Sequence, residues 1–318
     1  MRIGVVGLGV MGKNHARVLS GMQGVKALSF FDPQETQSRS MFGSTIYSDY
    51  RKIKSGDFDY CVVSAPTHLH REIAQFLAEI GVPALIEKPL ASSLQEADAV
   101  LEAFGSSGVL AAVGHIERYN PAVLSLKSLL EAGFLGEITQ IATTRVGPYS
   151  GRIRDVGVSK DLATHDVDLA AWLTGQRYSQ AFAQVANPMG GEHEDVLVAI
   201  AKLSGGTIAT HAVNRVSPRK DRLVSVTGEC GLLVADLIKQ SLVFFKSDEG
   251  HANVTETSKG SGTDFEVKGR ETEPLLKEHE VFQAALLNGG MEGVVTLEEG
   301  RYALEVAELF LSSATQSR

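Results

Sequence analysis

Six residues near the amino terminus form the pattern G-x-G-x-x-G: Gly7, Leu8, Gly9, Val10, Met11 and Gly12. They follow residues 2–6, a mostly apolar run that we expect to form a strand, and they open a stretch with helical periodicity. At such a junction the first glycine permits a tight turn, the second lets the backbone approach a pyrophosphate, and the third lets the helix pack closely on the strand. The pattern therefore predicts a dinucleotide site whose anion faces a helix amino terminus.

Asp32 ends the second predicted strand, twenty residues after Gly12. A carboxylate at this place accepts hydrogen bonds from the hydroxyls of an adenosine ribose, and it repels the 2′-phosphate of NADP. The residue therefore favours NAD over NADP as the cofactor. The alternative is that Asp32 and Pro33 merely begin a turn.

Two further segments follow predicted strands, residues 60–64 and 84–87, at the edge where open parallel sheets bind ligands. We expect cofactor contacts from both segments, at Ala65, Pro66, Thr67, His70, Glu87 and Lys88. Taken alone, His68 and His70 are more typical of a surface loop. A lysine beside a cofactor can polarise or protonate a substrate oxygen, so Lys88 is also a candidate for proton transfer.

A carboxylate and an imidazole, Asp161 and His165, stand four residues apart at the start of a predicted helix, residues 161–175. This spacing brings them to one face of the helix, and two groups of different pKa suit proton transfer. One alternative is that His165 is a hydrogen-bonded core histidine. Another is a metal site with Asp168, but the nearby sequence supplies no further His or Cys ligand, so we expect no metal.

Short apolar strands alternate with helical stretches up to about residue 118, which predicts a parallel sheet covered on both faces by helices. Beyond residue 133, β-branched and aromatic runs such as residues 138–146 and 196–203 follow one another across short turns. We therefore expect a Rossmann-type, doubly wound α/β domain at residues 1–118. An α+β substrate-binding and oligomerisation domain with a large, mostly antiparallel sheet should follow at residues 119–318, and its last helix could pack back on the first domain.

The composition is that of a globular protein that binds small molecules. The 318 residues are 43% hydrophobic and 21% charged, and the formal net charge of −8 disfavours nucleic acid and anionic lipid as partners. No run of about 18 apolar residues predicts a membrane span. Both cysteines, Cys61 and Cys230, lie in apolar stretches, so we expect two buried, reduced thiols and a cytoplasmic protein.

The combined motifs resemble the Gfo/Idh/MocA oxidoreductase family. The resemblance rests on the glycine pattern, the ribose aspartate, Glu87-Lys88-Pro89, and D-x-x-x-H-x-x-D ahead of Trp172-Leu173-x-Gly175. It extends to Glu273-Pro274-Leu275 with Glu278 and Phe282, and so covers essentially the whole chain. It implies an NAD-dependent dehydrogenase that oxidises a sugar or polyol hydroxyl.

The resemblance also implies a catalytic triad of Lys88, Asp161 and His165, in which His165 or Lys88 relays the hydroxyl proton. Asp168 is then a structural partner behind the triad. The family often has glycines just before its aspartate, whereas residues 158–160 are Val-Ser-Lys in this chain. The shape of the pocket mouth is therefore expected to differ.

Two segments, residues 114–122 and 145–157, look like a subgroup of nucleotide-sugar dehydrogenases, the UDP-N-acetylglucosamine 3-dehydrogenase type. We expect substrate contacts from Tyr119, Arg145, Arg152, Arg154 and His165. Guanidinium groups bind phosphate oxygens bidentately, although these arginines could instead pair with Asp155 and Asp161 or face water.

Several alternatives stay open at this stage. The substrate could be myo-inositol or a free sugar instead of a UDP-N-acetyl sugar oxidised at C3. A catalytically silent NAD- or sugar-sensing regulator is an alternative of a different class, but a sensor has no need of Lys88 and His165 together. We expect a homodimer or homotetramer formed through the carboxyl-terminal sheet.

Overall fold

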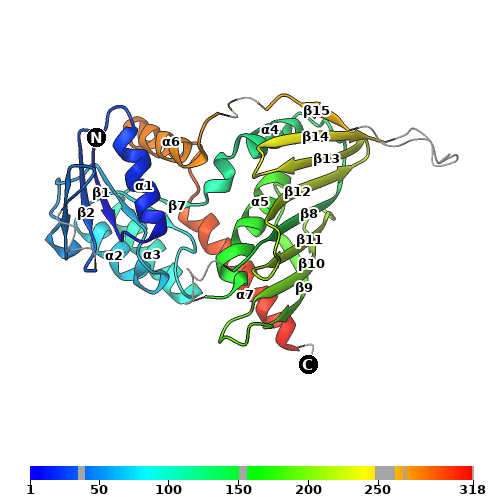
Figure 1. Cartoon of the computed structure of the whole chain (residues 1–318), viewed down its shortest axis with the longest axis horizontal. Coiled ribbons are helices and arrows are strands. Elements are labelled where there is room, and N and C mark those ends of the chain that lie inside the picture. The colour runs from blue at the N-terminus through cyan, green and yellow to red at the C-terminus, as the bar shows by residue number, and fades with distance from the viewer. Residues whose placement is uncertain (35–39, 150–155, 248–261, 268, 270, 317–318) are drawn as a thin grey trace, which may run out of the picture. The chain divides into compact units, whose positions relative to one another are not determined.

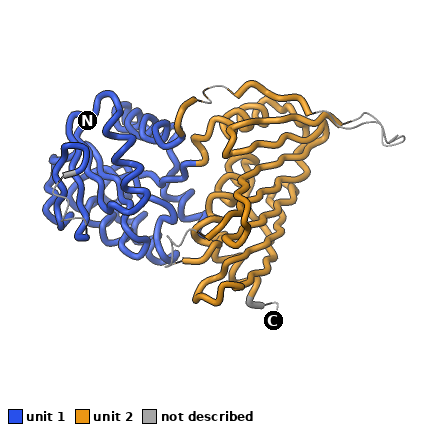
Figure 2. The backbone as a smooth tube through the Cα atoms, in the orientation of Figure 1, with its two compact units in different colours: residues 1–116, 274–304 blue, residues 117–273, 305–318 orange. Residues whose placement is uncertain are grey.

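The computed structural model describes residues 1–34, 40–149, 156–247, 262–267, 269 and 271–316. The chain forms two compact units, of which unit 1 contains residues 1–116 and 274–304 and unit 2 contains residues 117–273 and 305–318 (Figure 2). The first junction lies within two residues of the boundary expected after residue 118. Residues 274–304, by contrast, belong to unit 1 and not to a continuous second domain.

Unit 1 is built on a seven-stranded sheet with the order β3-β4-β2-β1-β5-β6-β7. Its neighbouring strands are parallel except for the short β3–β4 pair, which confirms the Rossmann-type, doubly wound prediction. The strands are β1 (Arg2–Val6), β2 (Ala27–Phe31), β3 (Ser40–Met41), β4 (Ser44–Tyr47), β5 (Tyr60–Val63), β6 (Ala84–Glu87) and β7 (Ala111–Gly114). The helices are α1 (Val10–Gly21), α2 (His70–Glu79), α3 (Leu94–Ser107), α6 (Pro274–Asn288) and the first part of α7 (Leu297–Gln316).

Apolar clusters cover both faces of this sheet. Every residue of β5, β6 and β7 is buried. The returning segment supplies part of both clusters: Phe282 of α6 belongs to one and Leu304 of α7 to the other. Residues 274–304 are therefore structural members of the unit that begins the chain.

Unit 2 is built on an eight-stranded sheet with the order β15-β14-β13-β12-β8-β11-β10-β9. All neighbours are antiparallel except the parallel pair β8–β11, as expected for an α+β domain. The strands are β8 (Ile138–Val146), β9 (Tyr178–Ala186), β10 (Val196–Leu203), β11 (Ile208–Asn214), β12 (Asp221–Gly228), β13 (Gly231–Asp236), β14 (Ser241–Lys246) and β15 (Thr263–Phe265). Helices α4 (Pro121–Glu131) and α5 (Thr164–Thr174) lie on one face of it (Figure 1).

The two faces of this sheet differ in burial. In β10 buried and exposed residues alternate, as expected for a strand with one face on the core. The exposed positions nevertheless include large apolar side chains, since Phe182 is 68% exposed, Val198 56% and Ile200 51%. The exposed face of β9 and β10 therefore carries an apolar patch that none of the described residues covers.

The two cysteines have different environments, which corrects the expectation of two buried thiols. Cys61 is buried in β5, but Cys230 is exposed because it lies in the turn between β12 and β13 and not within a strand. Among the helices of the described residues, we find none that combines the length and the apolar character that a membrane span requires.

Candidate active site

The glycine-rich turn of unit 1 depends on backbone packing that admits no side chain. Gly7 has a φ of +95°, and a Cβ there would overlap the backbone of Ala65. A Cβ on Gly12 would overlap the carbonyl oxygen of Gly7. Gly9 differs, because a Cβ at this position would meet nothing within 4 Å in the described structure. Gly7 and Gly12 therefore shape the turn, and Gly9 leaves open space in front of α1.

This open space fits the diphosphate of a dinucleotide. Gly9 is the residue before α1, and within the described chain no side chain caps that helix and no acidic residue lies in its first turn. The N–H groups at a helix start attract an anion, so an uncapped start suits a phosphate. Asp32 adds a second element of the fit: its Oδ2 accepts the N–H of Leu8 at 2.7 Å and its Oδ1 that of Gln34 at 2.8 Å. Each oxygen keeps a lone pair for a ribose hydroxyl.

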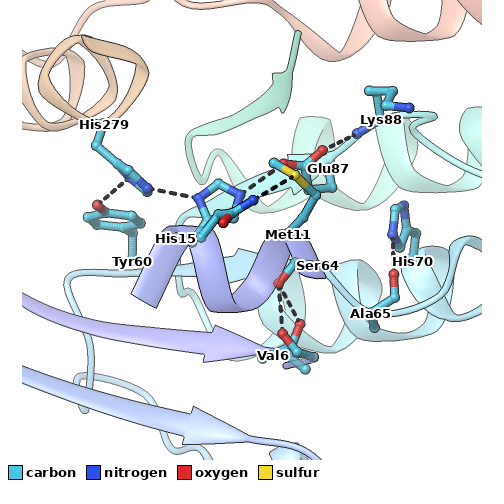
Figure 3. Close-up of polar contacts among 12 residues, drawn as sticks. Val6, Met11, His15, Tyr60, Ser64, Ala65, His70, Glu87, Lys88 and His279 are labelled. Carbon is cyan, nitrogen blue, oxygen red and sulfur yellow. Dashed lines mark hydrogen bonds and ion pairs between the residues drawn. The ribbon is translucent and has the colours of Figure 1, made fainter. Parts of the chain in front are cut away.

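The segment after β5 is tied to the segment after β6 by His70. Its Nε2 lies 2.9 Å from the carbonyl oxygen of Ala65 and its Nδ1 3.0 Å from that of Pro89 (Figure 3). Burial lowers the pKa of His70, so the neutral ring has one N–H for two carbonyl groups. His70 is only 1% exposed, and this geometry favours support of the loops over the direct cofactor contact that we expected. Of the other expected contacts, Pro66 is exposed and Thr67 is buried.

Glu87 and Lys88 lie at the carboxyl end of β6. Glu87 is 6% exposed, and its Oε1 lies 2.8 Å from Nε2 of His15 in α1. Its Oε2 accepts the backbone N–H of Lys88 at 3.2 Å, while the half-buried Lys88 side chain extends away from it (Figure 3). Glu87 is therefore occupied by protein partners, and Lys88 is the member of the pair whose side chain leaves this network.

In unit 2, Asp161 and His165 lie on one continuous helical segment. It begins as a π-helix at Ser159–Ala163, continues as α5, and ends at Gly175 with a φ of +67°. It thus starts two residues before the predicted helix. Asp161 is half-buried and donates its backbone N–H to the carbonyl of Gly157 at 2.9 Å, while His165 is 9% exposed.

Buried ion pairs hold this helix. Arg118 donates to both carboxylate oxygens of Asp168, at 2.9 and 2.5 Å. Arg145 donates to Asp166 at 3.0 Å and to Glu117 at 2.8 Å. Burial opposes the charge on Arg145, but the carboxylates of Asp166 and Glu117 outweigh it and raise its pKa. Burial also raises the pKa of Asp166, to about 6, despite the guanidinium beside it.

These pairs alter the interpretation of the predicted substrate residues. Arg145 is 2% exposed and held by two carboxylates, so the geometry does not favour the phosphate contact expected of it. Tyr119 is likewise 5% exposed. Arg152 and Arg154 lie outside the described residues. Sequence reasoning missed Arg222, which lies opposite Arg145 in the strand register and 3.3 Å from Glu117.

Comparisons with known proteins agree with both units. The family model described as "Oxidoreductase family, NAD-binding Rossmann fold" matches residues 1–115, and that of the GFO/IDH/MocA C-terminal domain matches residues 123–234. UDP-N-acetylglucosamine 3-dehydrogenase of Acidithiobacillus ferrooxidans is 27% identical over 79% of this chain and 78% of its own. Inositol 2-dehydrogenase of Rhizobium meliloti is 24% identical over 100% of this chain and 98% of its own length. Levoglucosan dehydrogenase, solved with NADH and levoglucosan, has the same fold at a TM-score of 0.88 and 20% identity, covering 100% of this chain and 98% of its own.

We call the glycine-rich turn, the open space before α1 and Asp32 the cofactor cradle. The contrast between Gly12 and Gly9 gives a test of it. We expect Gly12→Ala to destabilise the protein by about 1–3 kcal/mol, because the new methyl group displaces the backbone of the turn. Gly9→Ala should leave the melting temperature unchanged but raise the dissociation constant of NAD by about 10-fold, since its methyl group fills the space before α1. Thermal unfolding and NAD titration of both variants check this. Normal NAD affinity in Gly9→Ala would contradict the cradle.

Proposed function

Because the chain belongs to the Gfo/Idh/MocA oxidoreductase family, we propose that it oxidises a ring hydroxyl of a sugar with NAD as the hydride acceptor. The observation that carries this proposal is the position of Lys88. It follows β6 at the same carboxyl edge of the sheet as the glycine-rich turn after β1, and its backbone is bound by Glu87. Ligands of open parallel sheets bind at this edge. A lysine there can act on the substrate oxygen.

Oxidation of a secondary alcohol removes a hydride from carbon and a proton from oxygen. NAD, when bound, supplies the acceptor for the hydride. We assign the proton to this chain's own side chains: Lys88 or His165 relays it from the hydroxyl, and the carboxylate of Asp161 orients the reacting groups. Each assignment is supported by the residue's surroundings in its own unit. Lys88 is half-buried and directly follows β6, whereas the half-buried Asp161 and the nearly buried His165 lie on the helical segment that continues as α5.

For the substrate, we propose a UDP-N-acetyl sugar oxidised at C3. The similarity to UDP-N-acetylglucosamine 3-dehydrogenase supports this choice, and the similarity to inositol dehydrogenases supports myo-inositol as the second candidate. The two differ in charge, because only the nucleotide sugar carries a diphosphate. A reducing compartment such as the cytoplasm agrees with the two free cysteines.

We further propose that a second copy of the chain covers the apolar patch on β9 and β10 of the unit 2 sheet. Phe182 in β9 lies directly opposite Ile200 in β10, and Val198 follows two residues away on the same face. Exposed apolar side chains in register on adjacent strands form a continuous surface of the kind that homo-oligomers bury.

The preference for NAD follows from the charge of Asp32. We expect NAD to bind at least about 10-fold more tightly than NADP, because a 2′-phosphate would meet the carboxylate. Asp32→Asn keeps an oxygen acceptor for the N–H of Leu8 but removes the charge, so it should narrow this gap without unfolding the protein. Fluorescence titration with both dinucleotides measures the two affinities. Equal binding in the unaltered protein would overturn the role of Asp32.

The catalytic assignments predict a loss of turnover without a loss of cofactor. Lys88→Ala and His165→Ala should each lower kcat by about 100-fold or more while NAD affinity stays nearly unchanged. Lys277→Met, which removes an exposed lysine paired with Glu280, is the matched control and should behave as the unaltered protein. NAD reduction is measured with UDP-N-acetylglucosamine, N-acetylglucosamine and myo-inositol. Faster turnover of myo-inositol would replace the nucleotide-sugar proposal with the inositol one.

The proposed assembly predicts a change of mass on charge insertion. The double variant Phe182→Glu, Val198→Glu should convert a dimer or tetramer into monomers, because burying two charges of like sign at an interface is costly. Leu287→Lys alters an equally apolar side chain, 77% exposed in α6, and should leave the assembly intact. Light scattering after gel filtration gives each mass. An unaltered protein that is monomeric at micromolar concentration would exclude the assembly.

A further inference from the structure

A buried chain of hydrogen bonds crosses unit 1 from α6 to Glu87 (Figure 3). Nε2 of Gln283 donates to Oη of Tyr60 at 3.2 Å, and this hydroxyl lies 3.0 Å from Nδ1 of His279. Nε2 of His279 lies 2.9 Å from Nδ1 of His15, whose Nε2 lies 2.8 Å from Oε1 of Glu87. The three middle members are completely buried. Water therefore cannot replace any of these partners.

The two ends of the chain define its direction. At one end the backbone N–H of Lys88 can only donate, so Oε2 of Glu87 must accept. At the other end the amide nitrogen of Gln283 can only donate, so Oη of Tyr60 must accept from it. A hydroxyl that accepts from one partner is free to donate its own hydrogen to the other. Tyr60 is thereby the natural donor to His279.

Only one arrangement of protons gives every hydrogen an acceptor. A neutral imidazole has one N–H and one acceptor nitrogen. If Tyr60 donates to Nδ1 of His279, then Nε2 of His279 donates to His15, and Nε2 of His15 donates to an ionised Glu87. The reverse arrangement needs a proton on Glu87. In that arrangement both Gln283 and His279 also donate to the oxygen of Tyr60. Neither of these two partners can then accept the hydroxyl hydrogen of Tyr60.

The charges in unit 1 favour the same arrangement. Burial opposes ionisation of Glu87, but the hydrogen bond with His15 and the nearby ammonium group of Lys88 lower its pKa. Burial lowers the pKa of His279 well below its ordinary value, so this ring is neutral. Burial and the charge of Glu87 raise the pKa of Glu278, and neither carboxyl oxygen of Glu278 has a hydrogen-bond partner in the described structure. Glu278 is therefore the protonated acid, and Glu87 is the ionised one.

We propose that Glu87 is a positioning residue for Lys88, and that the chain from Tyr60 holds it ionised in one orientation, with His15 and His279 as Nε2–H tautomers. The functional half of this proposal rests on the catalytic role proposed for Lys88. Glu87 connects two segments whose relative positions matter for catalysis. His15 belongs to α1, which begins at the glycine-rich turn, and Lys88 follows β6. A lost hydrogen bond at Glu87 would leave the backbone of Lys88 without this anchor.

The tautomers are measured by NMR on the full chain labelled with ¹⁵N in its histidine rings, with signals assigned from His15→Gln and His279→Gln. We expect one protonated nitrogen in each ring, and in both rings it is Nε2. An Nδ1–H tautomer, or a doubly protonated His15, would overturn the proposal. This measurement needs no substrate, so it tests the hydrogen-bond chain even if the proposed function is wrong.

Glu87→Gln sharpens the test because it keeps the shape and changes the proton. The amide oxygen must accept from the backbone of Lys88, so the NH₂ group faces His15 and donates to it. Both histidines should then become Nδ1–H tautomers. His211, which lies in unit 2 between Thr143 at 2.8 Å and Tyr178 at 2.7 Å, is the internal control and should not change. Unchanged tautomers of His15 and His279 in this variant would refute the chain.

Kinetics test the positioning role. With the sugar that the unaltered enzyme oxidises fastest, Glu87→Gln and His15→Leu should lower kcat by about 10-fold or more, because a small misplacement of a catalytic group is costly. KM should change little. His15→Gln restores one donor and one acceptor and should recover most of the turnover that His15→Leu loses. Full turnover in Glu87→Gln, or equal losses in His15→Gln and His15→Leu at equal melting temperature, would refute positioning.

Discussion

The amino-terminal unit depends on the direct contact of backbone with backbone where α1 leaves the sheet. Gly12 packs on the carbonyl of Gly7, and Gly7 packs on the backbone of Ala65, at distances that no Cβ permits. This contact brings the start of α1 to the carboxyl edge of the parallel sheet. The same turn contains Leu8, whose N–H donates to Asp32, so it also connects the helix start to the end of β2.

The second unit is built around a different constraint, because helix α5 carries charged side chains at buried positions. Guanidinium groups from outside the helix meet its carboxylates: Arg118 meets Asp168, and Arg145 meets Asp166. Removing such ions from water costs free energy, and the attraction within a pair offsets this cost only while both partners are present. The ion pairs therefore fix the position of the helix more than they add to the net stability of the unit.

Sequence patterns predicted the regular parts of this molecule well, because each depends on residues close together in the chain. Strands β1, β6 and β8 have the predicted bounds. The return of α6 to unit 1 has no local signal, since it depends on apolar contacts with strands about 200 residues earlier. The partners of candidate site residues could not be predicted for the same reason. The sequence around Arg145 gives no indication that it pairs with Glu117, and the sequence around His15 gives none that it contacts His279.

The discontinuity of unit 1 has a consequence during synthesis on the ribosome. The segment that carries Tyr60 emerges early, whereas His279 and Phe282, which pack against it, are translated only after the whole sheet of unit 2. At that stage both cores are incomplete: unit 1 lacks the apolar residues of α6 and of the start of α7, and unit 2 lacks those of the end of α7, such as Phe310. Nascent chains expose apolar surface for as long as such a core is incomplete. Neither unit is therefore complete until residues beyond 273 have been translated, although unit 1 begins the chain.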